Sequence, residues 1–276
     1  MPGWSGILHD TREHNPMGIS FDRIADRYDE TRSVPPEIAE QITAHILRLG
    51  RTTPDTHFFE AGIGTGRIAL PMVERGYAYT GVDISEAMMN QLRQKIAGKP
   101  HRLTLLKADA TALPLEADQF DVAIAAHILH LIPAWQQALG EIRRVLKPGG
   151  VLIYFHHSTN KEGVSDGVSQ QWRQILQRYG YQSQFTGAVT EEVLDYLTQR
   201  GAELETVTIA EIPRTKPLGA VLQAYQDRIY SNMWRVPDDI YPSALGDLQT
   251  WAMERFESLE VEIESRYTMT LTAAYG

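Results

Sequence analysis

A carboxylate stands immediately before a glycine-rich turn in this chain, in the segment Glu60-Ala61-Gly62-Ile63-Gly64-Thr65-Gly66. The apolar pair Phe58-Phe59 before it is typical of the end of a buried strand. The apolar residues that follow, from Ile68 onward, indicate the start of a helix. Glycines at a strand-to-helix turn let a ligand approach the backbone closely, with amides of the helix N-terminus facing it. This arrangement predicts a site for a nucleotide-type cofactor.

The acid at position 60 discriminates among such cofactors. Glu60 would repel a pyrophosphate and would favour a cation, and S-adenosylmethionine carries an ammonium and a sulfonium but no phosphate. The dinucleotide fingerprint needs a third glycine or an alanine, and the chain has Arg67 at that position. We therefore predict S-adenosylmethionine as cofactor, and the residues disfavour an NAD-linked oxidoreductase.

Apolar runs and helical periodicities alternate along most of the chain. They predict strands near residues 57–61, 77–82, 103–108, 120–126, 151–155, 207–209 and 267–272, with helices between them. This rhythm predicts an α/β fold with a doubly wound, seven-stranded, mostly parallel sheet and a helical cap. The expected organisation is N-terminal helices that lid the cofactor (1–50), a cofactor-binding core (51–157), the remainder of the core with an extra helical segment (158–213), an inserted helical cap (214–262) and a final strand (263–276).

The overall composition excludes several classes of protein. The formal net charge is −9 and no block of Lys or Arg is present, which argues against a nucleic-acid-binding surface. The chain has no cysteine, so disulfides and thiol chemistry are excluded. Neither a signal peptide nor a membrane-spanning run is visible in the sequence. We expect a soluble cytoplasmic protein without a metal ion, and its oligomeric state stays open.

Polar residues follow the predicted strands at the points where the strands end. Glu60, Asp83, Asp109 and His127 all occupy such positions, and ligands of open parallel sheets bind beyond the carboxyl ends of the strands. Asp83, about twenty residues past the glycine turn, is placed to hold two ribose hydroxyls. The residues predicted to surround an adenine ring are Ile84 and Met88 on its faces and Asp109 and Ala110 at its edge.

The combined motifs resemble those of class I S-adenosylmethionine-dependent methyltransferases, in the group similar to the ubiquinone/menaquinone-biosynthesis C-methyltransferases with a type 11 methyltransferase domain. The resemblance covers roughly residues 20 to 157 and is carried by the glycine turn, Gly81-Val82-Asp83-Ile84-Ser85, Lys107-Ala108-Asp109-Ala110, Phe120-Asp121-Val122 and Val145-Leu146-Lys147-Pro148-Gly149-Gly150. It implies that the methionine moiety lies against Glu60, Ala61, Gly62 and Gly64. It also implies a contact from His127 near the methionine end, and an N-terminal lid that contains Tyr28 and Arg32.

The expected reaction is methyl transfer to a small, apolar or aromatic acceptor under the helical cap, leaving S-adenosylhomocysteine. If the acceptor must lose a proton, a general base is needed. The candidates by position are His127, His130 and His157, together with the neighbouring His156. The alternatives are a regulatory protein that binds S-adenosylmethionine without turnover, and an RNA or protein methyltransferase. Ordinary packing of Tyr28 and of the cap aromatics is an equally simple interpretation of those residues.

Overall fold

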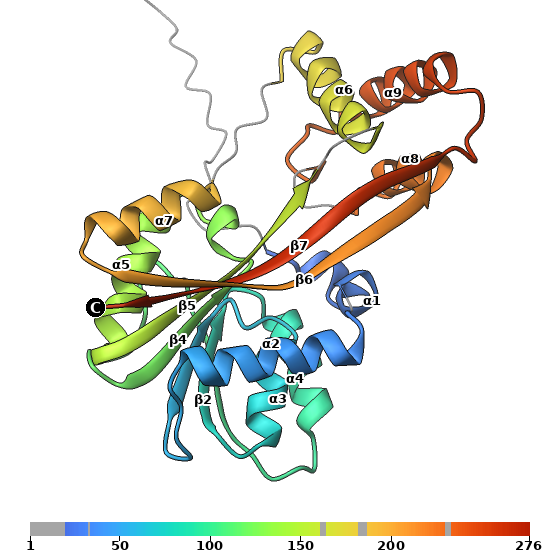
Figure 1. Ribbon diagram of the computed structural model, residues 1–276. Coiled ribbons are helices and arrows are strands. Elements are labelled where there is room, and N and C mark those ends of the chain that lie inside the picture. The colour runs from blue at the N-terminus through green and yellow to red at the C-terminus, as the bar shows by residue number, and fades with distance from the viewer. Residues whose placement is uncertain (1–19, 33, 161–163, 182–186, 230–232) are drawn as a thin grey trace, which may run out of the picture.

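A seven-stranded sheet with the strand order β3-β2-β1-β4-β5-β7-β6 forms the centre of the protein (Figure 1). The computed structural model describes residues 20–32, 34–160, 164–181, 187–229 and 233–276. Strands β1 to β5 run parallel, and β7 lies antiparallel between β5 and β6. The strand bounds are β1 (His57–Ala61), β2 (Ala78–Asp83), β3 (Arg102–Lys107), β4 (Phe120–Ala126), β5 (Leu146–Asn160), β6 (Glu203–Pro217) and β7 (Glu262–Tyr275). The predicted seven-stranded, mostly parallel sheet is confirmed.

Helices cover both faces of this sheet (Figure 1). One face packs against α2 (Pro36–Leu49), α3 (Ala69–Glu74) and α4 (Glu86–Ile96), and the other packs against α5 (Trp135–Val145) and α7 (Thr190–Gln199). A strand with helices on both of its faces must be apolar on both, which is why β4 is a nearly continuous apolar run. The remaining helical elements are η1 (Asp22–Ile24), α1 (Tyr28–Arg32), η2 (Leu129–Leu131), α6 (Val164–Arg178), α8 (Leu218–Gln226) and α9 (Tyr241–Arg255).

Capping residues define the helix starts nearest the pocket. The Ser85 hydroxyl accepts a hydrogen bond from the Met88 amide at 3.1 Å and so caps α4. Pro36 occupies the first position of α2, where a missing amide costs nothing. Near the N-terminus the chain forms the two short elements η1 and α1.

The last three strands extend well beyond the core and form a twisted arm (Figure 1). The pairing of β5 with β7 continues to Asn160 and Arg266, and that of β6 with β7 continues to Pro217 and Glu262. The strand predicted at residues 151–155 therefore extends well past its apolar run at both ends. Its polar extension is held by backbone ladder bonds to β7, which need no apolar side chain.

The far end of the arm carries α6, α8 and α9, whose apolar faces form a cluster separate from the two clusters of the core. The Trp172 ring lies edge-on to Tyr225 and Tyr241, with ring centroids 5.3 and 5.2 Å apart, and all three side chains are buried. These aromatics therefore fill the interior of the cap. Phe185, which the sequence groups with them, lies outside the described residues.

Candidate active site

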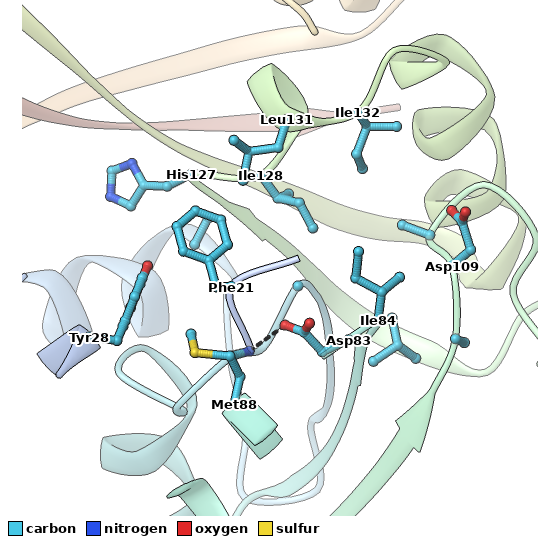
Figure 2. A pocket seen from close by; sticks show the side chains of 16 residues that line it. Phe21, Tyr28, Asp83, Ile84, Met88, Asp109, His127, Ile128, Leu131 and Ile132 are labelled. Atoms are coloured by element: carbon cyan, nitrogen blue, oxygen red, sulfur yellow. Dashed lines mark hydrogen bonds between the residues drawn. The ribbon is translucent and has the colours of Figure 1, made fainter. Parts of the chain in front are cut away.

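A pocket lies at the carboxyl ends of the parallel strands, where the loops after β1, β2, β3 and β4 meet (Figure 2). Its free volume is about 80 Å³. The structure brings most of the residues predicted from the sequence together around it. These are Tyr28, Gly62, Gly64, Asp83, Ile84, Met88, Asp109, Ala110 and His127.

The glycine turn after β1 leaves the pocket floor free of side chains. Gly62 and Gly64 have φ angles of +74° and +53°, which favour glycine. A Cβ atom at Gly64 would lie 3.2 Å from the Met88 methyl and 3.9 Å from an Asp83 carboxylate oxygen, so it would enter the pocket. A Cβ atom at Gly62 would collide with Ile128. The turn thus brings the backbone itself to the pocket surface.

The Asp83 carboxylate is held by the backbone on both of its oxygens. Oδ2 accepts from the Gly64 amide at 2.8 Å (Figure 2). Oδ1 accepts from the Ser85 amide at 2.8 Å. Burial raises the pKa of Asp83, and these amide donors oppose the shift without cancelling it. A rigid, partly desolvated carboxylate of this kind suits a ligand that donates hydroxyl hydrogens.

The loop after β3 forms the opposite wall of the pocket. Asp109 Oδ1 accepts from both the amide and the hydroxyl of Thr111, each at 2.8 Å, which fixes the turn. Ala110 is almost fully buried at this wall. Ala108 donates its amide to the Asp83 carbonyl at 3.1 Å, so the ends of β2 and β3 are joined by backbone.

Glu60 and Ala61 do not line the pocket. The Glu60 side chain is 2% exposed, and its Oε2 accepts a hydrogen bond from the Tyr79 hydroxyl at 2.6 Å. Burial raises the pKa of Glu60 to about 8, although the Tyr79 hydrogen bond and the Arg67 charge act in the opposite direction. Glu60 lies buried beneath the lining in this structure, and its predicted contact with the cofactor stays a prediction. The Arg32 side chain lies outside the described part of the chain.

The N-terminal segment closes the pocket on one side and is tied to the core by two carboxylates. Asp22 accepts a 2.5 Å hydrogen bond from the Ser85 hydroxyl. Asp29 accepts from the Thr65 hydroxyl at 2.6 Å and forms a 2.5 Å ion pair with Lys95. This segment contributes Tyr28 and one lining residue that the sequence analysis did not assign to the site, Phe21, whose ring lies 5.5 Å from that of Tyr28.

Two of the candidate histidines are in direct contact. His127 Nδ1 and His157 Nδ1 are 3.0 Å apart, and the His127 ring packs on Phe155. His127 has a φ of +53°, an unusual conformation for a residue other than glycine and one that is enriched at functional sites. The His157 ring also packs against Tyr267 of β7, with centroids 4.8 Å apart.

The other two histidines lie away from the pocket lining. Because side chains alternate along β5, His156 faces the opposite side of the sheet from His157, where its Nε2 lies 3.3 Å from the Thr272 hydroxyl. Burial lowers the pKa of His156. His130 lies in η2, where Gly187 approaches its backbone closely. The structure thus separates the His127–His157 pair from these two candidates.

Sequence reasoning missed part of the apolar wall. Ile128, Leu131 and Ile132 follow His127 closely in the sequence. Because His127 was itself a predicted site residue at a strand end, these apolar neighbours could have been included in the prediction. The further lining residues are Phe21, Val82, Ala108, Ala126, Ile128, Leu131 and Ile132.

The lining fits S-adenosylmethionine better than a dinucleotide. The Asp83 carboxylate can accept hydrogen bonds from hydroxyl groups, and apolar side chains line the space between the loops. At Gly64 the backbone itself forms the surface, because a Cβ atom there would enter the pocket. The charged side chains among the described lining residues are the carboxylates of Asp83 and Asp109, which favour a cationic ligand over a pyrophosphate. Across the described ranges, no cluster of three or more metal-ligating side chains is found, and no helix is long and apolar enough to cross a membrane.

Comparison with known proteins agrees with this site. A family model described as a methyltransferase domain matches residues 59–154. The ubiquinone/menaquinone biosynthesis C-methyltransferase UbiE of Syntrophotalea carbinolica is 34% identical over 167 residues, which cover 58% of this chain and 69% of that protein. The malonyl-[acyl-carrier protein] O-methyltransferase of Serratia marcescens is 26% identical over 60% of this chain and 61% of its own length. The match thus spans about three fifths of the latter relative.

A solved structure shares the fold. The Haemonchus contortus phosphoethanolamine N-methyltransferase 2, in complex with phosphomonomethylethanolamine and S-adenosylhomocysteine, superposes with a TM-score of 0.56 at 17% identity. The superposition covers 92% of this chain and 57% of that one. With the sequence matches, the sheet order and the pocket, the chain belongs to the class I S-adenosylmethionine-dependent methyltransferases. The cofactor of this class is S-adenosylmethionine.

Proposed function

We propose that this protein transfers a methyl group from S-adenosylmethionine to a small, apolar or aromatic acceptor. The observation that supports this most directly is the pocket itself, which is lined by the backbone-held Asp83 and by His127, the latter in contact with His157 behind it. S-adenosylmethionine, when bound, supplies a methyl group on a positively charged sulfur, and the products are the methylated acceptor, S-adenosylhomocysteine and a proton. The protein's own residues must then orient both molecules, exclude water and accept that proton.

On this proposal, each pocket wall binds one part of the cofactor. Asp83 accepts hydrogen bonds from the ribose hydroxyls, while Ile84 and Met88 pack against the adenine. Asp109 and Ala110 lie at the adenine edge. The glycine turn at Gly62 and Gly64 lies against the methionine moiety, with Glu60 behind it and His127 near the reacting end. Tyr28 and Arg32 belong to the N-terminal lid.

The lid must move when the cofactor binds. The free volume of about 80 Å³ is well below the roughly 300–1,000 Å³ of typical small-molecule sites. Phe21 and Tyr28 come from the short η1–α1 segment, which is tied to the core by Asp22 and Asp29. We therefore infer that this segment shifts outward to admit the cofactor and then closes over it.

The histidine pair is suited to take a proton from the acceptor. A hydrogen bond between two Nδ1 atoms requires that one of them carries the proton and the other accepts it. If His127 is the donor, its buried Nε2 is the basic nitrogen. A proton gained there leaves an imidazolium whose Nδ1–H points at His157, so the second ring stabilises the charge. His157 is exposed and could pass the proton to solvent.

The acceptor side of the pocket is apolar. Ile128 and Leu131 lie beside His127 in the lining (Figure 2), and the ring of Tyr267 packs against His157. These contacts favour an acceptor with an apolar or aromatic body. The buried aromatics of the cap give this proposal no support, because they pack against one another.

The test is production of S-adenosylhomocysteine by the full chain with a panel of phenols, quinols and apolar carboxylic acids. We expect turnover with at least one acceptor, and a loss of about 100-fold or more in His127→Gln. His157→Gln should shift the pH profile of turnover without weakening S-adenosylmethionine binding. His130→Gln is the matched control and should keep wild-type rates.

Two outcomes would contradict the proposal. Thermal stabilisation by S-adenosylmethionine without turnover on any acceptor would indicate a binding protein. Salt-sensitive RNA binding together with RNA methylation would indicate a nucleic-acid methyltransferase. Equal rates in the wild type, His127→Gln and His157→Gln would show that neither histidine acts as the general base. That result would not contradict methyl transfer itself.

A further inference from the structure

A second cavity lies at the edge of the sheet opposite the cofactor pocket. It has a volume of about 290 Å³ and opens between α5, α7 and the first residues of β5. Parallel strands begin at this edge, whereas the cofactor loops follow the strand ends. In Figure 1 this region is next to the C-terminus, beside α5 and α7. The cavity is larger than the free space of the cofactor pocket and belongs to none of the cofactor or acceptor machinery.

The two helices present the same combination of side chains to this cavity. Helix α5 contributes Leu139 and, one turn later, Arg143, and helix α7 contributes Leu197 and Arg200 in the same way. Leu152 of β5 adds to the apolar floor. The cavity therefore has an apolar interior. Two exposed guanidinium groups lie beside it, that of Arg143 from the last turn of α5 and that of Arg200 from the C-cap of α7.

The charge around the cavity is positive although the chain carries a formal net charge of −9. The described side chains that line it include three cationic groups, Arg143, Arg200 and Lys147, and one carboxylate, Asp118. The backbone of Gly276 also lines the cavity, and a Cβ atom built there would lie 3.8 Å from Arg143 Nη1. Lys147 is already paired with Asp121 at 2.7 Å. Neither Arg143 nor Arg200 forms an ion pair with a described carboxylate.

The two guanidinium groups are held near the cavity by the helices that carry them. The Arg200 guanidinium lies 3.5 Å from the centroid of the Tyr196 ring, which also lines the cavity. Arg200 Nη1 also donates a 3.5 Å hydrogen bond to the Tyr196 carbonyl. A guanidinium stacked on a ring keeps its other N–H donors at the edge available for an anion. Arg143 lies one turn of α5 beyond Leu139. The two arginines can therefore offer planar donors to a carboxylate or phosphate group.

We propose that this cavity is a binding site for a small amphipathic anion, with a carboxylate or phosphate head between Arg143 and Arg200 and an apolar body over Leu139, Leu152 and Leu197. The site is separate from the cofactor pocket, so this proposal does not rest on the proposed methyl transfer. The shared chemistry of the ligand is an anionic group on a short alkyl or aromatic body. Which anionic head it carries is decided by the probes below.

Gly140 offers a way to fill the cavity without disturbing the fold. It lines the cavity within α5, and a Cβ atom there would meet no heavy atom within 4 Å. Leucine is also a better helix former than glycine. Gly140→Leu should therefore fold at least as stably as the wild type while its side chain occupies the space of the ligand body.

The experiment is calorimetric titration of the full chain with octanoate and octyl phosphate, and with octanol and octylammonium as head-group controls. We expect at least one anion to bind the wild type and the two controls to bind at least about tenfold more weakly. The double variant Arg143→Gln/Arg200→Gln should lose affinity by about tenfold or more, and Gly140→Leu should abolish binding. Arg173→Gln, on the exposed side of the distant α6, is the matched control and should bind as the wild type does.

Several outcomes would overturn the proposal. Octylammonium or octanol binding as tightly as the anions would show that the guanidinium groups do not select the head. Undiminished anion binding in folded Gly140→Leu, checked by circular dichroism, would place the ligand elsewhere. Absence of binding by both anions to the wild type would show that the cavity holds no such ligand. Octanoate binding without octyl phosphate binding, or the reverse, supports the site and identifies its head group.

Discussion

Replacing Glu60 with glutamine should remove a strong pH dependence from the stability of the protein. Burial raises the pKa of Glu60 from the ordinary value of 4.5 to about 8. Since the folded-state pKa lies above the unfolded-state pKa, the neutral folded carboxyl contributes stability that is fully present below pH 4.5. That stability is lost as the pH rises through 8. A glutamine side chain at this position has no proton to lose, and it can still accept the hydrogen bond from Tyr79.

The magnitude follows from the size of the shift. Each pKa unit corresponds to about 1.4 kcal/mol, so the difference in unfolding free energy between Glu60→Gln and wild type should grow by about 3 kcal/mol from pH 5.5 to pH 8.5. Because the difference is taken at each pH, the titrations of the other groups largely cancel. We expect the variant to be the more stable protein at the alkaline end of this range.

Urea unfolding followed by circular dichroism at several pH values measures this difference. Glu254→Gln, at an exposed position on α9, is the matched control and should track the wild type at every pH. A constant difference between Glu60→Gln and the wild type from pH 5.5 to 8.5 would refute the reasoning, because a buried carboxyl with a raised pKa could not give it.

The same variant tests whether Glu60 acts on the cofactor. A cationic ligand next to a neutral carboxyl lowers its pKa, so S-adenosylmethionine binding near pH 7 should release close to one proton in the wild type and none in Glu60→Gln. Calorimetry in two buffers of different ionisation enthalpy measures that proton. Unchanged affinity in the variant, with no proton released by the wild type, would leave Glu60 a purely structural residue.

Three further variants separate the cofactor wall, the lid and the cap. Asp83→Asn should weaken S-adenosylmethionine binding by about tenfold or more in calorimetry, because a charged acceptor is lost; unaltered affinity would remove Asp83 from the site. Asp29→Ala loses its contacts to Thr65 and Lys95, which together contribute about 1 kcal/mol. The affinity for S-adenosylmethionine should therefore fall about fivefold. Full affinity, together with a loss of about 1 kcal/mol in the free energy of unfolding, would contradict a lid role. Trp172→Ala, in the separate cap cluster, should lower the local stability of the cap by about 3–5 kcal/mol. Hydrogen exchange should then become faster in α6, α8 and α9 but not in the core. Faster exchange throughout the protein would show that cap and core unfold together.

The sequence was sufficient for the parts of the site that depend on short-range patterns. Asp83 and Asp109 follow strands whose apolar runs are visible locally, and Ser85 has the residue type of an N-cap. The register of a parallel sheet then brings these strand ends to one edge without further information. This is why the sequence could predict that these residues meet at one pocket, whereas their contacts with the cofactor stay predictions.

Features that depend on distant contacts were not predictable in the same way. His127 and His157 meet because β4 and β5 pair in parallel up to the end of β4, which brings together two segments thirty residues apart in the chain. The raised pKa of Glu60 comes from its burial in the packed structure, while Tyr79 of the neighbouring strand donates a hydrogen bond that acts in the opposite direction. The length of the arm depends on backbone pairing among polar residues, for which periodicity gives no signal.

The two sides of the pocket are held by different kinds of contact, and this difference has a functional consequence. On the cofactor side, Gly62 and Ile63 donate their amides to the Val82 carbonyl at 2.8 and 3.0 Å, and Ala108 donates to Asp83, so three loops are joined by backbone. Side-chain substitutions leave such bonds in place, and the carboxylate of Asp83 stays preorganised. Beside His127, side-chain contacts between rings, such as that of His157 with Tyr267, are the contacts that the structure shows. If the acceptor binds there as proposed, we expect substitutions in the arm to alter acceptor choice while cofactor binding is retained, as one fold can serve many substrates.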